Sequence, residues 1–245
     1  TGASNSAFGR DALRANTTGA ENVAIGALAL DANTTAANNV AVGVEAMTSN
    51  TTGTQNAAVG KAALAANTTG AYNTAMGPYA LNANTTADSN TAVGWNSLSK
   101  NTTGTANTGV GESALRNATT GDNNTGLGFS ALGAAVVTGS NNTSTGFNAG
   151  AAITSGASNT FVGANAGDGT AAGNYNVAVG YLALSAVAGS SNVALGYASS
   201  VDCTGSNNTT AGEFSGYALT SGTNNLFLGH DAGRTGSPGG NITTG

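Results

Sequence analysis

A five-residue phrase of polar and apolar positions recurs along the whole chain: an Asn, two further residues, a mostly apolar residue and a Gly. Successive copies lie 16 to 18 residues apart. The glycines are Gly9, Gly26, Gly43, Gly60, Gly77, Gly94, Gly111, Gly128, Gly146, Gly163, Gly180, Gly196, Gly212 and Gly229. The asparagines, four residues earlier, are Asn5, Asn22, Asn39, Asn56, Asn73, Asn90, Asn107, Asn124, Asn142, Asn159, Asn176, Asn192, Asn208 and Asn225. Fourteen copies without a gap predict a repeat architecture.

Within each phrase, apolar or β-branched residues alternate with small ones. In the second copy, Val23 and Ile25 flank Ala24. An alternation with a period of two over so few positions is typical of a short strand with two different faces. Three residues after each glycine comes Ala or Ser, and the next position is Leu or Met in eight consecutive copies, from Leu13 to Leu132. We expect this Leu position to point inward.

A unit of about 17 residues is too short to bury its own apolar side chains, but identical units can stack so that each extends the sheets of the last. Asn, Thr and Gly are poor helix formers, and no stretch sustains a helical period. The pattern therefore predicts an all-β parallel solenoid, or β-roll, of about 14 coils with at least roughly 35% strand, more than an average domain. The Asn positions should form a ladder of amides, and the invariant glycines should need a positive φ or leave no room for a Cβ.

Residues 1–245 are interpreted as one continuous repeat domain with two sub-regions. Strict 17-residue repeats cover 5–132, and less regular repeats cover 133–245. In the second region the Leu position gives way to Gly150, Gly167, Gly216 and Gly233. We expect a change of cross-section there rather than a second domain.

Composition narrows the function. Only 7% of residues are charged, against about 25% in ordinary domains. Six Lys and Arg at a net charge of −5 cannot neutralise a phosphate backbone, which argues against a nucleic-acid partner. No apolar run approaches the length of a membrane span, so no membrane insertion is expected. The single cysteine, Cys203, cannot form an intrachain disulfide.

Candidate chemistry is sparse. The only histidine, His230, stands beside Asp231, and we interpret it as a solvated residue, because a site needs convergent partners. Acidic residues fall at several different repeat positions, so they form no ion ladder. We therefore expect no enzyme activity, no catalytic residue, no cofactor and no metal.

A second phrase, Asn-Thr-Thr, recurs at 16–18, 33–35, 50–52, 67–69, 84–86 and 101–103. Local turn chemistry, with Asn and Thr bonding nearby backbone, is the favoured interpretation. N-glycosylation sequons and an ice-binding Thr face are alternatives, the latter disfavoured because adjacent strand residues face opposite sides. Ala36 and Ala87 replace the Gly that usually follows, so this turn should tolerate a Cβ and not be strictly left-handed.

The position after the invariant glycine is the most variable and holds several aromatic residues: Trp95, Phe129, Phe147, Tyr181 and Tyr197. Exposed amphipathic rings there suit contact with a glycan or a partner. Packing between protomers and ordinary surface variation are the alternatives.

The phrases Asn22-Val-Ala-Ile-Gly26 and Asn39-Val-Ala-Val-Gly43, each with Ala three residues after the glycine, resemble the head repeats of trimeric autotransporter adhesins. The longer unit with Asn-Thr-Thr-Gly resembles repeat regions of phage tail-fibre-like proteins and related bacterial surface proteins. The resemblance implies a left-handed parallel β-roll and a trimer of chains packed side by side. The adhesin repeat is shorter, at about 14 residues, so extra residues must enlarge a loop or a strand here.

These observations favour a non-enzymatic structural fibre or adhesin, extracellular, on a virion tail fibre or a cell surface, that presents or mediates attachment to a host glycan or protein receptor. We expect a parallel homotrimer, with the Ala position of the strand meeting two copies of itself around the axis. The alternatives are a self-assembling filament whose coil ends stack, and a solenoid whose flank binds glycan or ice.

Overall fold

The computed structural model describes residues 2–186 and 189–234. These residues form fourteen strands of three residues each and no helix, and hence no helix that could cross a membrane. The strands are β1 (Ser6–Phe8), β2 (Val23–Ile25), β3 (Val40–Val42), β4 (Ala57–Val59), β5 (Thr74–Met76), β6 (Thr91–Val93), β7 (Thr108–Val110), β8 (Thr125–Leu127), β9 (Thr143–Thr145), β10 (Thr160–Val162), β11 (Val177–Val179), β12 (Val193–Leu195), β13 (Thr209–Ala211) and β14 (Leu226–Leu228). The prediction of an all-β parallel solenoid is confirmed.

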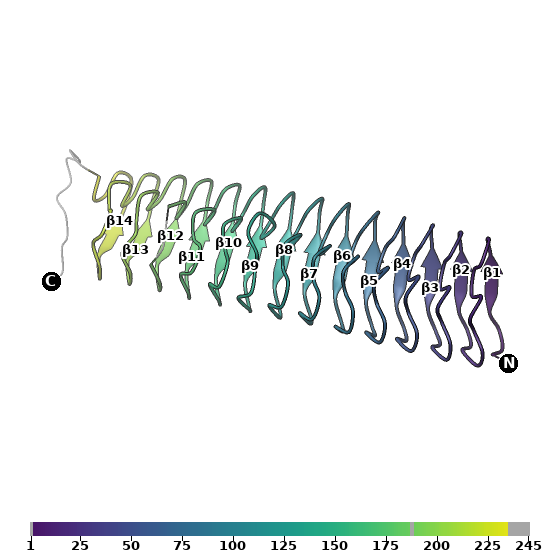
Figure 1. The fold of residues 1–245 in the computed structure, drawn as a ribbon. Coiled ribbons are helices and arrows are strands. Elements are labelled where there is room, and N and C mark those ends of the chain that lie inside the picture. The colour runs from purple at the N-terminus through teal and green to yellow at the C-terminus, as the bar shows by residue number, and fades with distance from the viewer. Residues whose placement is uncertain (1, 187–188, 235–245) are drawn as a thin grey trace. The chain divides into compact units, whose positions relative to one another are not determined.

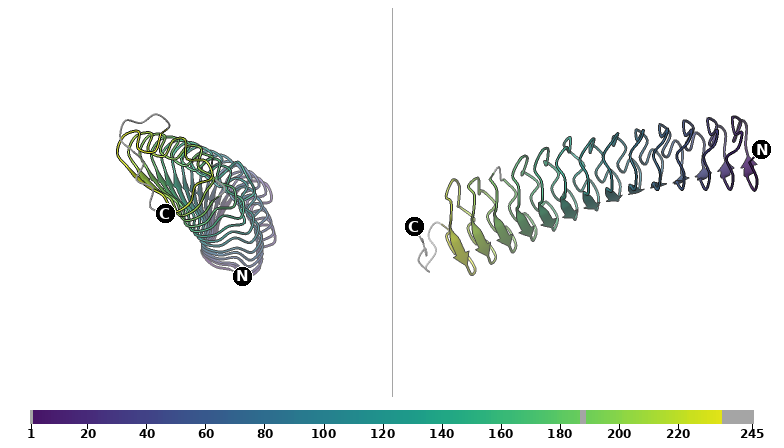
Figure 2. Two further views of the ribbon diagram at one scale, coloured as in Figure 1. Left: turned by 90° about the vertical axis from the view of Figure 1, so that its left-hand side faces the viewer. Right: turned by 90° about the horizontal axis from the view of Figure 1, so that it is seen from below.

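The chain divides into two compact units, unit 1 (1–123, with β1–β7) and unit 2 (124–245, with β8–β14). Within each unit, consecutive strands pair in parallel and lie side by side (Figure 1). Ala24 pairs with Ala41 in unit 1, and Ala178 pairs with Ala194 in unit 2, so the same repeat position stacks from coil to coil. Figure 2 shows that the strands of each unit lie along one side of its coils. A single domain over the whole chain stays a prediction.

The strand content is well below the expected 35%, because each strand has only three residues and is followed by a segment of alternating handedness and by turns. In the coil of Gly60, positive φ recurs at every second residue: 133° at Gly60, 52° at Ala62 and 54° at Leu64. A left-handed residue other than Gly costs about 1–2 kcal/mol. Hydrogen bonds between coils offset this cost, since Ala62 N donates to Val44 O at 2.9 Å and Leu64 N donates to Ala80 O at 2.9 Å.

The invariant glycines need both the left-handed backbone and the missing side chain. A Cβ on Gly60 would lie 2.6 Å from the carbonyl carbon of Gly77 in the next coil. This confirms the expectation for these glycines. Gly53 lies outside the left-handed region, as predicted. A Cβ on it would nevertheless meet Gly70 O of the next coil, so the expected tolerance of a Cβ does not hold at this coil without a shift of the backbone.

The inside of each unit 1 coil holds small residues and one Leu or Met. Ala24 and Leu30 are both fully buried, which confirms the inward direction of the Leu position. The apolar residues on either side of the Ala point outward instead, and Ile25 is 42% exposed. The β-branched and other large residues of the strands therefore lie outside the coil. A coil built from a three-residue strand has one inner strand position, and the small residue occupies it.

Some coils of unit 2 are filled by a different set of side chains, although the coil of β11 keeps the buried Ala178 and Leu184. Phe161 takes the inner strand position in β10 and is fully buried. A Cβ on Gly167 would lie 2.6 Å from the Phe161 ring, and a Cβ on Gly150 would lie 3.0 Å from it. The ring therefore uses the space that Leu side chains occupy elsewhere. Phe227 stands in the same relation to Gly233. The expected change of cross-section is thus a move of the large side chain from the Leu position to the inner strand position.

Candidate functional site

A ladder of buried asparagines ties each coil to the next. Asn39 N donates to Asn22 Oδ1 at 3.0 Å, one coil away. The same Asn22 donates through Nδ2 to Ala36 O at 2.9 Å, which joins the two ends of its own coil. In unit 2, neighbouring amides also bond directly, as from Asn159 Nδ2 to Asn142 Oδ1 at 3.0 Å. Each amide thus satisfies buried backbone groups that the solenoid would otherwise leave unpaired.

Unit 1 has a second ladder, built from the Asn of the Asn-Thr-Thr phrase. Asn67 Nδ2 donates to Asn50 Oδ1 at 2.8 Å, and Asn50 also makes the predicted local bond to Gly53 O at 2.9 Å. Thr51 Oγ1 donates to Thr68 O of the next coil at 3.0 Å. The local turn interpretation therefore missed the bonds between coils. The signal was in the sequence, because these asparagines recur with the same 17-residue spacing as the first set.

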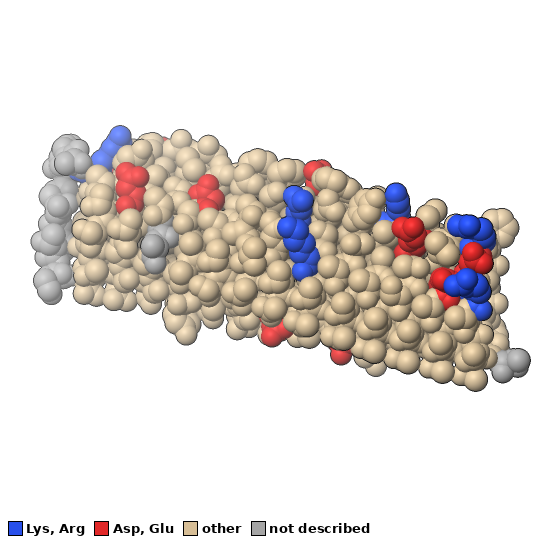
Figure 3. Space-filling model, in the orientation of Figure 1, with Lys and Arg blue, Asp and Glu red and all other residues tan. Residues whose placement is uncertain are grey.

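The outer columns, which we define as the positions one and three residues before each invariant glycine, form the outward face of each sheet. They contain no charged residue and no Asn or Gln in any of the fourteen copies. Many are large and apolar, with Met76 45% and Val59 40% exposed. Figure 3 shows that most of the visible surface carries no charged side chain. The position three residues before the glycine is Ser or Thr in eight of the fourteen copies, so the face is an uncharged strip of apolar and hydroxyl side chains along each unit.

The aromatic column, which we define as the position after each invariant glycine, is exposed at all five predicted residues, as at Trp95. In unit 2 the rings pair from coil to coil. Phe129 and Phe147 stack with centroids 5.4 Å apart and planes 11° apart, and Tyr181 stacks on Tyr197 at 5.5 Å and 18°. The regular coil spacing thus orders these rings before any partner binds.

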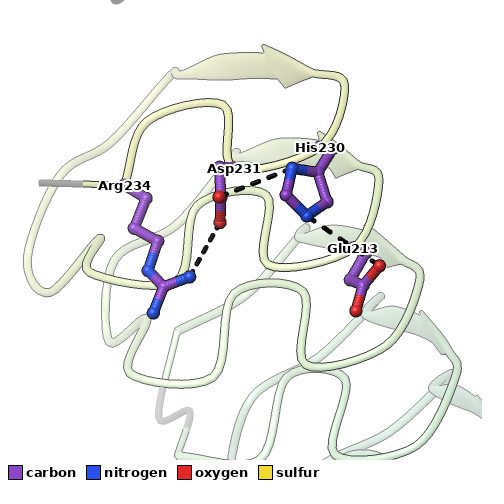
Figure 4. A network of polar contacts seen from close by, with 4 residues as sticks. All are labelled: Glu213, His230, Asp231 and Arg234. Carbon is purple, nitrogen blue, oxygen red and sulfur yellow. Dashed lines mark hydrogen bonds and ion pairs between the residues drawn. The ribbon is translucent and has the colours of Figure 1, made fainter. Parts of the chain in front are cut away.

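The polar network around His230 lies in the last described coils of unit 2 (Figure 4). His230 Nδ1 lies 3.4 Å from Asp231 Oδ2, and His230 Nε2 lies 3.9 Å from Glu213 Oε2. Arg234 Nη1 donates to Asp231 Oδ1 at 2.9 Å, and its guanidinium lies 4.8 Å from the centre of the Phe214 ring. The His230 side chain is 65% exposed, so the network is open to solvent. Among the residues described, no group of three or more His, Cys, Asp or Glu is arranged to hold a metal ion.

The single cysteine is structural. Cys203 is buried, and Asn208 Nδ2 donates to its sulfur at 3.5 Å. Burial raises the pKa of the Cys203 thiol, which keeps it protonated and unreactive at neutral pH. The thiol fills the space that a ladder Asn fills in unit 1.

Comparison with models of protein families finds no match for this chain, and comparison with curated protein sequences finds none either. The outer columns and the aromatic column are therefore the features from which a function can be proposed.

Proposed function

We propose that the chain is a non-enzymatic structural segment of an extracellular fibre or adhesin, assembled as a parallel homotrimer through its outer columns. The observation that carries the proposal is the uncharged strip of apolar and Thr side chains on the outward face of the strands of each unit. Seven strands about 4.8 Å apart and three residues long give a strip of about 330 Å² in projection for each unit. Exposed patches that reach a few hundred Å² on a monomer are often functional.

A second copy of the same chain suits this strip. The outer columns repeat once per coil, so a parallel copy presents matching side chains at every level, as symmetric assemblies require. The contact would join side chains such as Ile25 and Val59. The expectation that the Ala position of the strand lies at the trimer axis is wrong, because Ala24 and its equivalents are buried inside their own coil.

The proposed role is mechanical. Two sets of backbone bonds and at least one Asn ladder link neighbouring coils within each unit, which favours a stiff segment that resists local opening. Such a segment suits the shaft of a tail fibre or a surface adhesin that holds a receptor-binding part away from its base.

Light scattering on the purified chain tests the assembly. Three chains of 23.3 kDa should give a species near 70 kDa. Replacing Val59 and Met76 by Lys places two charges in the strip and should yield a folded monomer, since desolvating unpaired charge is costly. A matched control is Thr69→Lys, which adds a charge at an exposed position outside the outer columns and should leave the trimer intact.

Each alternative predicts a different mass. A stable wild-type monomer, or a dimer of two chains, would contradict the trimer. Masses that grow with concentration would instead support a filament joined through the coil ends. If the double Lys variant does not fold, Met76→Gln supplies a milder version of the same test.

A further inference from the structure

The aromatic column of unit 2 is interrupted once between two stacked pairs of rings. Phe147 ends one pair and Tyr181 begins the next, and between them stands Ala164. The backbone fixes this order, because Asn165 N donates to Phe147 O at 2.8 Å and Leu182 N donates to Ala164 O at 3.1 Å. Ala164 therefore lies one coil from each ring. We call the space over its methyl group, between the two rings, the Ala164 interval.

The size of the interval follows from the coil spacing. Two steps of about 4.8 Å place the Phe147 and Tyr181 rings about 10 Å apart. Phe147 stacks on Phe129 with one face, and Tyr181 stacks on Tyr197 with one face. The opposite faces of Phe147 and Tyr181 are those turned toward the interval. Both side chains are about half exposed, at 51% and 46%, so solvent reaches them.

We propose that the Ala164 interval binds one pyranose ring of a neutral saccharide. Carbon atoms in contact lie about 3.5–4.0 Å apart, so a flat ring between two others needs only about 7–8 Å and would be loose here. A pyranose chair is thicker than a flat ring and directs C–H groups from both of its faces. It would therefore touch both aromatic faces, whose negative π-surfaces attract those hydrogens.

The surroundings favour an uncharged ligand with hydroxyl groups. Asn148 and Asn165 directly follow the aromatic column in adjacent coils and are partly exposed, so their amides can bond sugar hydroxyls. Between Asp122 and Asp202 the sequence contains a single charged residue, Asp168. No cation is therefore available in these coils to recognise a sulfated or sialylated sugar. The inference adds a ligand-binding site to the structural role proposed above, and it depends on the aromatic column rather than on the outer columns.

Saturation-transfer NMR and calorimetry with two probes, the β-1,4-linked hexamers of glucose and of N-acetylglucosamine, test the site. We expect transfer from the protein to ring protons of at least one hexamer. Phe147→Ala and Tyr181→Ala each remove one wall and should weaken binding about tenfold, the effect of losing one good ring contact. Ala164→Phe fills the interval with a protein ring and should abolish binding, whereas Ala164→Ser should preserve it.

Trp95→Ala is the matched control, because it removes an exposed ring of the same column in unit 1 and should leave the affinity unchanged. The proposal is overturned if neither hexamer receives transfer, or if binding survives Ala164→Phe at full strength. Tighter binding of p-cresol than of either sugar would also overturn it and identify an aromatic side chain as the occupant. Light scattering separates this result from the proposed assembly, since Ala164→Phe should not change the mass of the trimer.

Discussion

Unit 1 places Ala58 at the inner strand position and Leu64 at the Leu position, whereas unit 2 places Phe161 and Gly167 at the equivalent sites. The coil keeps its backbone in both cases: Leu64 and Gly167 have φ of 54° and 62°. The large side chain can therefore stand at either of these two positions, while the backbone conformation and the bonds between coils stay the same. Phe161 also lies against Gly150 of the preceding coil, whose inner strand residue is the small Ser144, so buried volume is shared between positions and between neighbouring coils, as close packing requires.

The polar interior differs in the same way. Asn50 belongs to the second ladder of unit 1, and Val137 and Ile153 occupy the corresponding buried column of unit 2. Thr138 N donates to Thr154 O at 2.8 Å just beyond that column, as Thr51 N donates to Thr68 O in unit 1. One Asn ladder thus suffices to close a coil. The column of the second ladder holds Val137, Ile153, Thr170 and Cys203 in unit 2, so it accepts apolar and small polar side chains as well.

The largest effect on stability should come from replacing the buried Phe161 ring of unit 2. Phe161→Ala should lower the free energy of unfolding by about 3–5 kcal/mol, because it leaves a cavity the size of a ring. Gly167→Leu should lower it by about 1–3 kcal/mol through overpacking against Phe161. The double variant recreates the pairing of unit 1 and should be more stable than either single variant in urea unfolding. Simple addition of the two losses would contradict the exchange of volume.

The invariant glycine should be indispensable where the next turn is not. Gly60→Ala combines a positive φ with a Cβ only 2.6 Å from Gly77, and should cost about 3 kcal/mol. Gly53→Ala should cost less than Gly60→Ala, because its φ suits an L residue and only the contact of the added Cβ must be relieved. The added Cβ there meets Gly70 O, but Ala36 and Ala87 show that the column accommodates one with a small backbone shift. Thermal melting compares the two variants, and equal losses would show that the turns are not distinct.

Replacing a single Asn of the second ladder should lower the free energy of unfolding, even though unit 2 is folded without this ladder. Asn50→Val removes the acceptor of Asn67 Nδ2 and leaves one rung unmatched, which should cost about 1–3 kcal/mol. Replacing Asn33, Asn50 and Asn67 together should cost less than three times the single loss, since fewer unpaired amides remain for each replacement. Urea unfolding of the single and triple variants measures this coupling. Strictly additive losses would show that the ladder is not cooperative.

The periodicity of the sequence was enough to predict the solenoid, the register of its strands and the burial of Leu64 and its equivalents. A period of two could not tell which strand face is inside, because Ala58 and its apolar neighbours are both plausible core residues. Phe161 and Gly167 stand six residues apart, and only the path of the coil brings them together. The low strand content followed from left-handed residues such as Ala62, which carry no compositional signal. The aromatic column was visible as a variable position, but its ring stacking depended on the coil spacing.

The smallest expected effect concerns a carboxylate position that has a cation in the preceding coil in unit 1 and an uncharged residue there in unit 2. In unit 1, Asp31 meets a cation from the preceding coil, with Arg14 Nε 2.9 Å from Asp31 Oδ1. In unit 2, the residue at the same repeat position is Asp168, and the residue 17 positions before it is Ala151, which has no charge. Partial burial raises the pKa of Asp168, although hydrogen bonds from its own backbone N–H and that of Gly169 oppose the shift.

A pKa that is higher in the folded state than in the unfolded state means that folding favours the protonated form. Its contribution to stability is therefore complete below the unfolded pKa of about 3.9 and is lost as the pH rises through the folded pKa. Asp168→Asn removes this loss. The variant should match the wild type near pH 3 and exceed it at pH 7 by no more than about 0.5 kcal/mol, because solvent screens a half-exposed group. Urea midpoints at the two pH values measure the difference, and Ala151→Arg, which copies the pair of unit 1, should reproduce part of the gain. A variant that is less stable at pH 7 than at pH 3, relative to the wild type, would contradict the assignment.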